Sequence, residues 1–140
     1  MHRIFIDTDI VLDFFFDRVP FSEDAARIFS LCESQKIRGF VTPVICSNTY
    51  YILRQTANHQ KVIEKLSQLM TIMEVVPMDK EVVMQALASG FRDFEDALQN
   101  FAAVKSDIIE LILTRNVKDY SLSNIGALSP DNYLKLISDR

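Results

Sequence analysis

Short apolar runs alternate with helix-like segments along the whole chain. The runs hold apolar side chains at successive positions, which is typical of strands buried on both faces. Strands that alternate with helices predict a parallel sheet covered by helices on both sides, which is a three-layer α/β/α sandwich of four to five strands. The strands are expected at residues 3–6, 39–42, 72–76 and 108–113, with a short fifth at 127–128.

Capping and helix-breaking residues mark the ends of the intervening helices. Ser22 and Asp79 have side-chain oxygens that suit a helix start, and Thr42-Pro43 combines such a cap with proline at the first helical position. Gly90 is expected to terminate a helix. The helices are expected at residues 10–16, 22–32, 44–54, 58–70, 79–90, 93–105 and 131–138.

The composition fits one domain and limits how the chain could bind nucleic acid. With 140 residues, 49% of them hydrophobic, the chain is expected to form a single domain over residues 1–140. A net charge of −4 and a pI near 5.1 argue against a broad basic face that binds nucleic acid by bulk electrostatics. A metal-dependent nuclease stays open, because its cation supplies the positive charge that a phosphate needs.

Several chemistries are excluded by what the sequence lacks. The three glycines lie too far apart for a glycine-rich phosphate loop, and neither of the two histidines suits a Ser-His-Asp arrangement. Cys32 and Cys46 form no CxxC pair, which indicates reduced, buried thiols in a cytoplasmic protein and argues against a zinc site. The N-terminal apolar run is too short for a secretory signal, and no run approaches the ~18 residues of a membrane span.

Acidic residues follow two of the predicted strands. Asp7 comes directly after the first strand, and Asp119 lies in the polar segment that follows the fourth. Asp96 stands at the start of the helix that leads into the fourth strand, so it faces the same end of the sheet. If the first and fourth strands are neighbours, these carboxylates converge at the carboxyl ends of the strands, where open parallel sheets bind ligands.

Carboxylates that share a pocket repel one another unless a cation neutralises them. A pocket with oxygen ligands and no histidine or cysteine favours Mg²⁺ or Mn²⁺, and Mg²⁺ commonly joins one or two carboxylates to phosphate oxygens. The acidic cluster therefore predicts phosphodiester chemistry.

Each acid also has a purely local explanation. Asp7 fits a turn, and Asp119 fits a loop. Asp93 and Asp96 fit the cap and third position of one helix, and Glu95 is expected to face solvent. A structural domain whose acids serve only as caps and turns is therefore another interpretation.

Three segments together resemble a known family. They are Ile4-Phe5-Ile6-Asp7-Thr8-Asp9, Asp93-Phe94-Glu95-Asp96-Ala97-Leu98-Gln99 and Thr114-Arg115-Asn116-Val117-Lys118-Asp119-Tyr120. In order and spacing they are similar to the PIN domain family, whose best-known bacterial members are VapC-type toxin ribonucleases. The resemblance implies a parallel α/β/α sandwich and a Mg²⁺- or Mn²⁺-dependent endoribonuclease that cleaves RNA with activated water, as the toxin of a toxin–antitoxin pair.

The resemblance also assigns the site residue by residue. Asp7, Asp96 and Asp119 match the catalytic, metal-binding acids of the family. Thr114 matches its usual Ser/Thr beside the site, and Asp9 and Asn116 are expected to support these residues from behind.

One position departs from the family pattern. The family normally has a glutamate in the helix after the second strand, where this chain has Asn48. An amide oxygen can coordinate a metal, but it brings no charge and cannot act as a base. A catalytically weakened PIN-like domain that serves as an RNA-binding or protein-interaction module is therefore the alternative function.

Expected partners come mainly from the resemblance. They are an RNA substrate, a small antitoxin that covers the acidic pocket, and a second copy of the chain in a homodimer; no membrane partner is expected. Arg115 and Lys118, beside the pocket, are candidate phosphate contacts. The aromatic clusters at residues 14–16 and 50–51 are expected in the core rather than at an interface.

Overall fold

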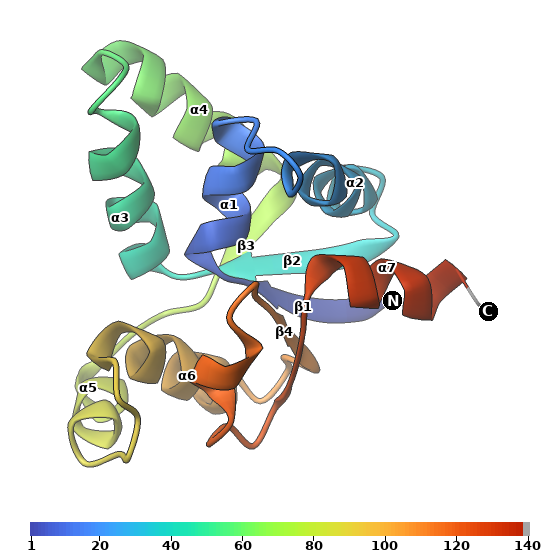
Figure 1. The fold of residues 1–140 in the computed structure, drawn as a ribbon. Coiled ribbons are helices and arrows are strands. Elements are labelled where there is room, and N and C mark those ends of the chain that lie inside the picture. The colour runs from blue at the N-terminus through green and yellow to red at the C-terminus, as the bar shows by residue number, and fades with distance from the viewer. Residues whose placement is uncertain (139–140) are drawn as a thin grey trace.

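A single parallel sheet forms the centre of the protein. The computed structural model describes residues 1–138, and within that range five strands lie in the order β3-β2-β1-β4-β5. Figure 1 shows the sheet with helices above and below it. The strands are β1 (His2–Ile6), β2 (Ile37–Val41), β3 (Met73–Val75), β4 (Leu111–Leu113) and β5 (Gly126–Leu128).

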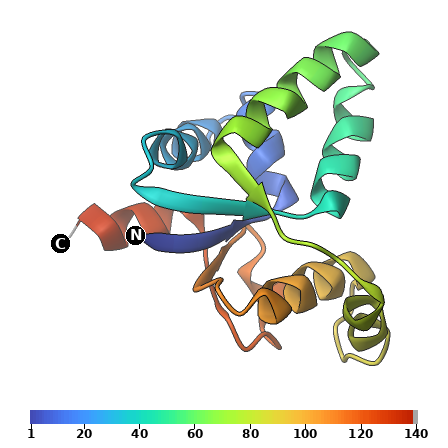
Figure 2. The ribbon, with the colours of Figure 1, turned by 180° about the vertical axis from the view of Figure 1, so that it is seen from behind.

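Helices cover both faces of the sheet. One side carries α1 to α4 and also α7, which packs against α2, and the other side carries α5 and α6 (Figures 1 and 2). This arrangement confirms the predicted α/β/α sandwich. The helices are α1 (Thr8–Phe15), α2 (Ser22–Glu33), α3 (Pro43–Leu53), α4 (His59–Ile72), α5 (Lys80–Leu87), α6 (Phe94–Ser106) and α7 (Pro130–Ser138), and a short 3₁₀ helix, η1 (Val117–Tyr120), joins β4 to β5.

Two of the predicted helix caps are confirmed, and two predicted boundaries are wrong. Thr42 and Asp79 each accept a hydrogen bond from a backbone amide three residues on. Ser22 is not a cap, because the chain enters α2 through Phe21 and Ser22 is already helical. Gly90 does not terminate α5, which ends at Leu87 without any glycine in a left-handed conformation.

The core lies on both faces of the central strand. Ile4, Phe5 and Ile6 are all fully buried, as the uninterrupted apolar pattern of β1 predicts. The aromatic clusters differ from the prediction, because Phe14 is 39% exposed and Tyr51 is 68% exposed.

The fourth strand is shorter than the apolar pattern predicts. Its paired residues begin at Ile4 and Leu111, so Ile108 and Ile109 precede the ladder, and Glu110 joins β1 through its backbone amide, which donates to the Arg3 carbonyl at 2.9 Å. Asp107, in a left-handed conformation, ends α6, and the chain needs the next three residues to reach the sheet. Apolar residues therefore extend beyond the strand because they pack in the connection.

Cys32 is buried, Cys46 is partly buried, and both are free thiols. Burial raises the pKa of the Cys32 thiol to about 12, which keeps it protonated and unreactive. Within residues 1–138, no helix has the length and apolar character needed to cross a membrane.

The first and fourth strands are neighbours, as the site prediction requires. The chain reaches β2 from β1 through helices on one face, but it reaches β4 through α5 and α6 on the other face. The winding therefore reverses between β1 and β4, where parallel sheets bind ligands. The Asp7 amide donates to the Leu113 carbonyl at 3.0 Å and extends this pairing by one residue. Asp7 and Thr114 consequently stand side by side at the carboxyl end of the sheet.

Candidate active site

Asp7 is the most deeply placed acid of the site. It caps α1, and its Oδ1 accepts a hydrogen bond from the Thr8 amide at 2.8 Å. Its Oδ2 accepts from Thr114 Oγ1 at 2.9 Å and from Tyr120 Oη at 3.2 Å. Only 8% of Asp7 is exposed, so these donors hold its carboxylate in one orientation. The role of Tyr120 was not predicted from the sequence, although the residue belongs to the third segment of the resemblance.

Asp9 holds the loop that follows β4. Its Oδ2 accepts hydrogen bonds from the Arg115 amide at 3.0 Å and from Asn116 Nδ2 at 3.2 Å. The backbone amide of Asn116 in turn donates to Thr114 Oγ1 at 3.1 Å. Asp9 and Asn116 thus contact the segment that carries Thr114, which donates to Asp7. Asp9 Oδ1 is buried and has no hydrogen-bond partner among the described residues.

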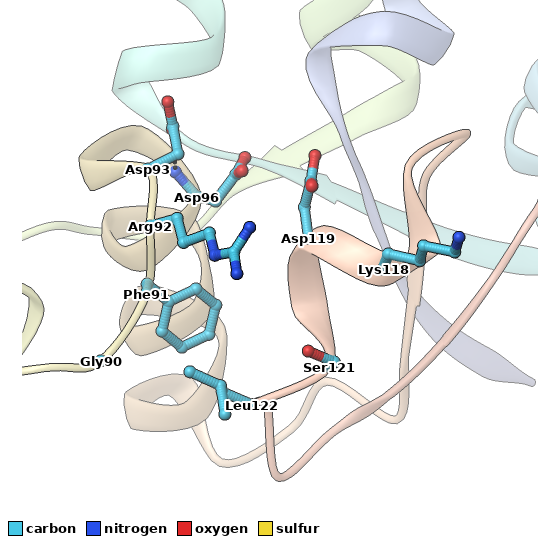
Figure 3. A pocket seen from close by; sticks show the side chains of 9 residues that line it. All are labelled: Gly90, Phe91, Arg92, Asp93, Asp96, Lys118, Asp119, Ser121 and Leu122. Carbon is cyan, nitrogen blue, oxygen red and sulfur yellow. Dashed lines mark hydrogen bonds between the residues drawn. The ribbon is translucent and has the colours of Figure 1, made fainter.

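Asp96 projects from the first turn of α6. The predicted cap is confirmed, because Asp93 Oδ1 accepts from the Asp96 amide at 2.9 Å and fixes this turn. Asp96 and Asp119 lie on facing walls of a cavity of about 700 Å³, which we call the main cavity (Figure 3). Its lining comprises Gly90, Phe91, Arg92, Asp93, Asp96, Lys118, Asp119, Ser121 and Leu122.

A second, shallower hollow adjoins the main cavity. Asp7, Asp9 and Glu95 line it, and Asp93 and Asp96 line both spaces. We call it the Asp7 hollow. The start of α6 therefore forms a shared wall, and Asp96 lies between Asp7 in the hollow and Asp119 in the main cavity. We call the two adjoining spaces together the acidic opening.

Burial and mutual repulsion raise the pKa values of three acids of the site, Asp7, Asp9 and Asp96. The pKa of Asp96 rises to about 7 through burial and then through the charges of Asp7, Asp93 and Asp119. The pKa of Asp7 is raised by burial, against the lowering effect of its hydrogen-bond donors. Burial and the charge of Asp7 raise the pKa of Asp9 to about 6. The opening is therefore short of positive charge, which is the condition that favours cation binding.

Glu95 does not face solvent, contrary to the expectation. It is partly buried and accepts a hydrogen bond from Asn48 Nδ2 at 2.6 Å. Its charge also raises the pKa values of Asp7 and Asp96, so it belongs to the same electrostatic cluster. The predicted ligand Asn48 thus reaches the site through contact with a fourth carboxylate. This contact joins α3 to α6, which lie far apart in the sequence, and no local pattern signals it.

Arg115 is engaged inside the protein, contrary to its expected role at the RNA. Its Nε lies 2.7 Å from Asp13 Oδ2, and its guanidinium lies over the Phe21 ring at 4.0 Å. Asp13 is only 1% exposed, so Arg115 neutralises a buried charge. This pair was not predicted from the sequence, although an acid inside the apolar segment at 10–16 was a signal for it.

Two other basic residues line the main cavity in different ways. The Lys118 side chain extends away from the other lining residues, whereas the Arg92 guanidinium lies between the start of α6 and η1 (Figure 3). Arg92 was not singled out from the sequence, because its position beside the acids depends on the turn between α5 and α6.

The donor set suits a hard divalent cation. The acids offer oxygen atoms, with no histidine or cysteine lining either space, and Asp9 Oδ1 is a buried oxygen without a partner. Within residues 1–138, no three acidic, histidine or cysteine residues form a ready-made metal cage. Mg²⁺ needs no such cage, because it binds through one or two carboxylates and keeps several waters. The residues present therefore fit Mg²⁺ or Mn²⁺.

The fold and the site define a parallel α/β/α domain with an acidic opening at the reversal point of its sheet. A family model described as the PIN domain matches residues 3–118. The chain belongs to the PIN domain family. No curated protein matches the sequence.

Solved structures share this fold at low sequence identity. VapBC-1 from nontypeable Haemophilus influenzae superposes with a TM-score of 0.67 at 13% identity, covering 92% of this chain and 98% of that chain. A toxin–antitoxin complex from Klebsiella pneumoniae gives 0.66 at 15% identity, covering 91% and 97%. VapC20 from Mycobacterium tuberculosis, a toxin that cleaves the sarcin–ricin loop, gives 0.60 at 20% identity, covering 78% and 86%. At these identities the similarity establishes the fold.

Proposed function

We propose that the protein is a Mg²⁺- or Mn²⁺-dependent endoribonuclease. The observation that carries the proposal is the convergence of Asp7, Asp96 and Asp119 on one opening, where the pKa of Asp96 is raised to about 7. Such a cluster is stable in its charged form only beside a cation. Membership of the PIN domain family and the fold shared with an RNA-cleaving toxin support RNA as the substrate.

The residues of the site have different roles that follow from their positions. Asp7, Asp96 and Asp119 would hold the cation, which when bound supplies positive charge for the scissile phosphate and activates water. Thr114 and Tyr120 orient the Asp7 carboxylate through their hydroxyl groups. Asp9 fixes the segment that carries Thr114, so the donors to Asp7 are in place before substrate arrives.

Glu95 compensates for the missing charge at Asn48. The Asn48 amide donates to Glu95, so the carboxylate comes from α6 and the neutral hydrogen-bonding partner comes from α3. The site then holds a fourth negative charge beside Asp7 and Asp96. Asn48 positions Glu95 through its amide nitrogen, and the amide oxygen of Asn48 would assist in holding the cation.

A second candidate function is an RNA-binding or protein-interaction module with little catalysis. The neutral side chain at Asn48 favours it, since this position cannot act as a base. Glu95 argues against such a module, because its carboxylate, next to Asp96, restores the negative charge that Asn48 lacks. Calorimetric titration with Mn²⁺ separates the two functions, since the module predicts no binding at millimolar concentration.

The toxin of a toxin–antitoxin pair is the cellular role that we infer. Structures with the same fold include a toxin–antitoxin complex. The expected partner is a small antitoxin protein that covers the acidic opening, and a second copy of the chain would form a homodimer. Expression of the protein should arrest growth, and the arrest should be absent for Asp96→Asn.

Cleavage assays test the proposed activity directly. Single-stranded and structured RNAs are incubated with the protein in Mg²⁺, in Mn²⁺ or in EDTA. Cleavage is expected with either cation, none is expected in EDTA, and Asp96→Asn should lose at least about 100-fold in rate. Glu33→Gln, at the exposed end of α2, is the matched control and should cleave normally. Full activity of Asp96→Asn would overturn the proposal.

A further inference from the structure

The main cavity has an acidic side and an apolar floor. Asp96 and Asp119 form the acidic side, and Phe91 and Leu122 lie at the other end (Figure 3). Leu122 is 60% exposed, so the floor is open to a ligand. A volume of about 700 Å³ is enough for one nucleotide unit beside the acids. The cavity therefore has room for a strand whose phosphate sits next to the carboxylates.

Most basic groups near the two spaces are already engaged or turned away. Arg18 lies 3.8 Å from the buried Asp13, and Arg115 forms the close pair with the same acid. Lys118 extends away from the cavity. Arg92 is exposed, and its guanidinium makes no hydrogen bond or ion pair with any residue in the range 1–138. It is thus the cation available to a phosphate in the main cavity.

The backbone on each side of Arg92 is held in place. Asp93 caps α6 through its bond to the Asp96 amide. Phe91 packs edge-on against Phe101, with ring centroids 5.9 Å apart, and against Tyr120 at 6.4 Å. Two anchored neighbours fix where the Arg92 side chain starts, so its planar fork reaches the cavity from a defined point.

We propose that Arg92 is a substrate-positioning residue that binds a backbone phosphate of the RNA strand in the main cavity. The inference rests on the proposed ribonuclease function. A phosphate that approaches Asp96 and Asp119 meets repulsion, and the guanidinium between α6 and η1 offsets that repulsion while offering paired N–H donors. Arg92 thereby directs the strand along the floor between α6 and η1, with the neighbouring phosphodiester at the acids.

RNA binding measured separately from cleavage tests this assignment. Fluorescence anisotropy uses a fluorescein-labelled single-stranded RNA oligonucleotide of mixed sequence, with Ca²⁺ replacing Mg²⁺, and a denaturing gel confirms that the RNA stays intact. Arg92→Ala is expected to weaken binding about 10-fold and to reduce the slope of log K against log salt by about 0.7, the value for one phosphate contact on a single strand. Arg92→Lys should keep the slope and recover part of the affinity.

Two exposed residues provide matched controls. Arg27→Ala, on α2, and Lys36→Ala, between α2 and β2, each remove one exposed positive charge away from the main cavity, so both should bind within about 2-fold of the unmodified protein. Equal losses for all three variants would show a general charge effect and overturn the assignment. An unchanged salt slope for Arg92→Ala would also overturn the Arg92 assignment. If the unmodified protein still cleaves RNA in that case, the nuclease function stands. An unmodified protein that neither binds nor cleaves RNA overturns both.

Discussion

Asn48 Nδ2 lies 2.6 Å from Glu95 Oε1, which brings an amide of α3 against a carboxylate of α6 at the edge of the acidic opening. The Asn48–Glu95 pair carries one negative charge, whereas a glutamate at position 48 would place a second carboxylate beside Glu95 and the two would repel. The identity of each residue therefore depends on the other, and neither can be judged from its own helix.

Exchanging the two side-chain types tests this dependence. Glu95→Gln is expected to weaken Mn²⁺ binding about 10-fold, because the opening loses a charge, and Asn48→Glu alone should lower thermal stability in EDTA through repulsion. The double variant Asn48→Glu/Glu95→Gln keeps one charge and one amide and should bind Mn²⁺ nearly as the unmodified protein does. Calorimetry measures the affinities. Normal Mn²⁺ binding by Glu95→Gln would remove Glu95 from the site.

The raised pKa of Asp96 predicts how stability changes with pH without divalent cations. The pKa is about 7 in the folded chain against 3.8 for an unperturbed aspartate, so the folded state binds more protons between these limits. The free energy of unfolding should therefore fall as the pH rises from about 4 to about 7. Asp96→Asn should reduce this slope and, at about pH 8, raise the free energy of unfolding by about 1 kcal/mol, after allowance for solvent screening.

Urea denaturation in EDTA across this pH range provides the measurement. Glu33→Gln removes an exposed acid on α2, and its free energy of unfolding should change with pH as that of the unmodified protein does. A slope that persists unchanged in Asp96→Asn would show that other groups bind the protons. Saturating Mn²⁺ should flatten the decline, because the cation binds the charged form of the folded protein.

The buried pair of Asp13 and Arg115 should be important for stability. Arg115→Met leaves an acid that is 1% exposed with only Arg18 at 3.8 Å, and the expected loss is about 3 kcal/mol. Asp13→Leu/Arg115→Met removes both charges and should recover part of that loss. Urea denaturation measures both, with Arg27→Met as the surface control. A loss below about 0.5 kcal/mol for Arg115→Met would contradict a structural role.

The hydroxyl of Thr114 should matter more for catalysis than for folding. Thr114→Val removes the donor at 2.9 Å from Asp7 Oδ2 and leaves only Tyr120 on that oxygen. We expect about a 10-fold fall in kcat, equivalent to about 1.4 kcal/mol. Thr114→Ser keeps the donor and should retain most activity. Single-turnover cleavage of RNA distinguishes them, and equal activity of the two variants would contradict the orienting role.

Much of the fold follows from local patterns in the sequence. Buried strands, the Thr42 and Asp93 caps, and the order of strands and helices predict the sandwich, because each depends on a few adjacent residues. Strand ends are less well predicted, since Ile109 is buried in the connection before β4 and not in the ladder. The limit is physical: an apolar side chain can be buried without belonging to a strand.

The site residues likewise differ in how well the sequence predicts them. Asp7 and Thr114 are predictable because each directly follows a strand, and parallel strands end at the same edge. The contact of Asn48 with Glu95 depends on how two distant helices pack, so the sequence alone left Glu95 in solvent. Arg92 was missed for a related reason, since an arginine before a helix cap carries no local sign of the cavity beside it.

The pairing of β1 with a strand of only three residues has an evolutionary consequence. Asp7 and Thr114 meet because Leu113 accepts the Asp7 amide. A one-residue shift of β4 would turn every side chain to the opposite face of the sheet and move Thr114 away from Asp7. Insertions and deletions between α6 and β4 should therefore be purged by selection. The exposed turn near Leu122 can change length more freely, and it is the place where relatives with different RNA preferences would diverge.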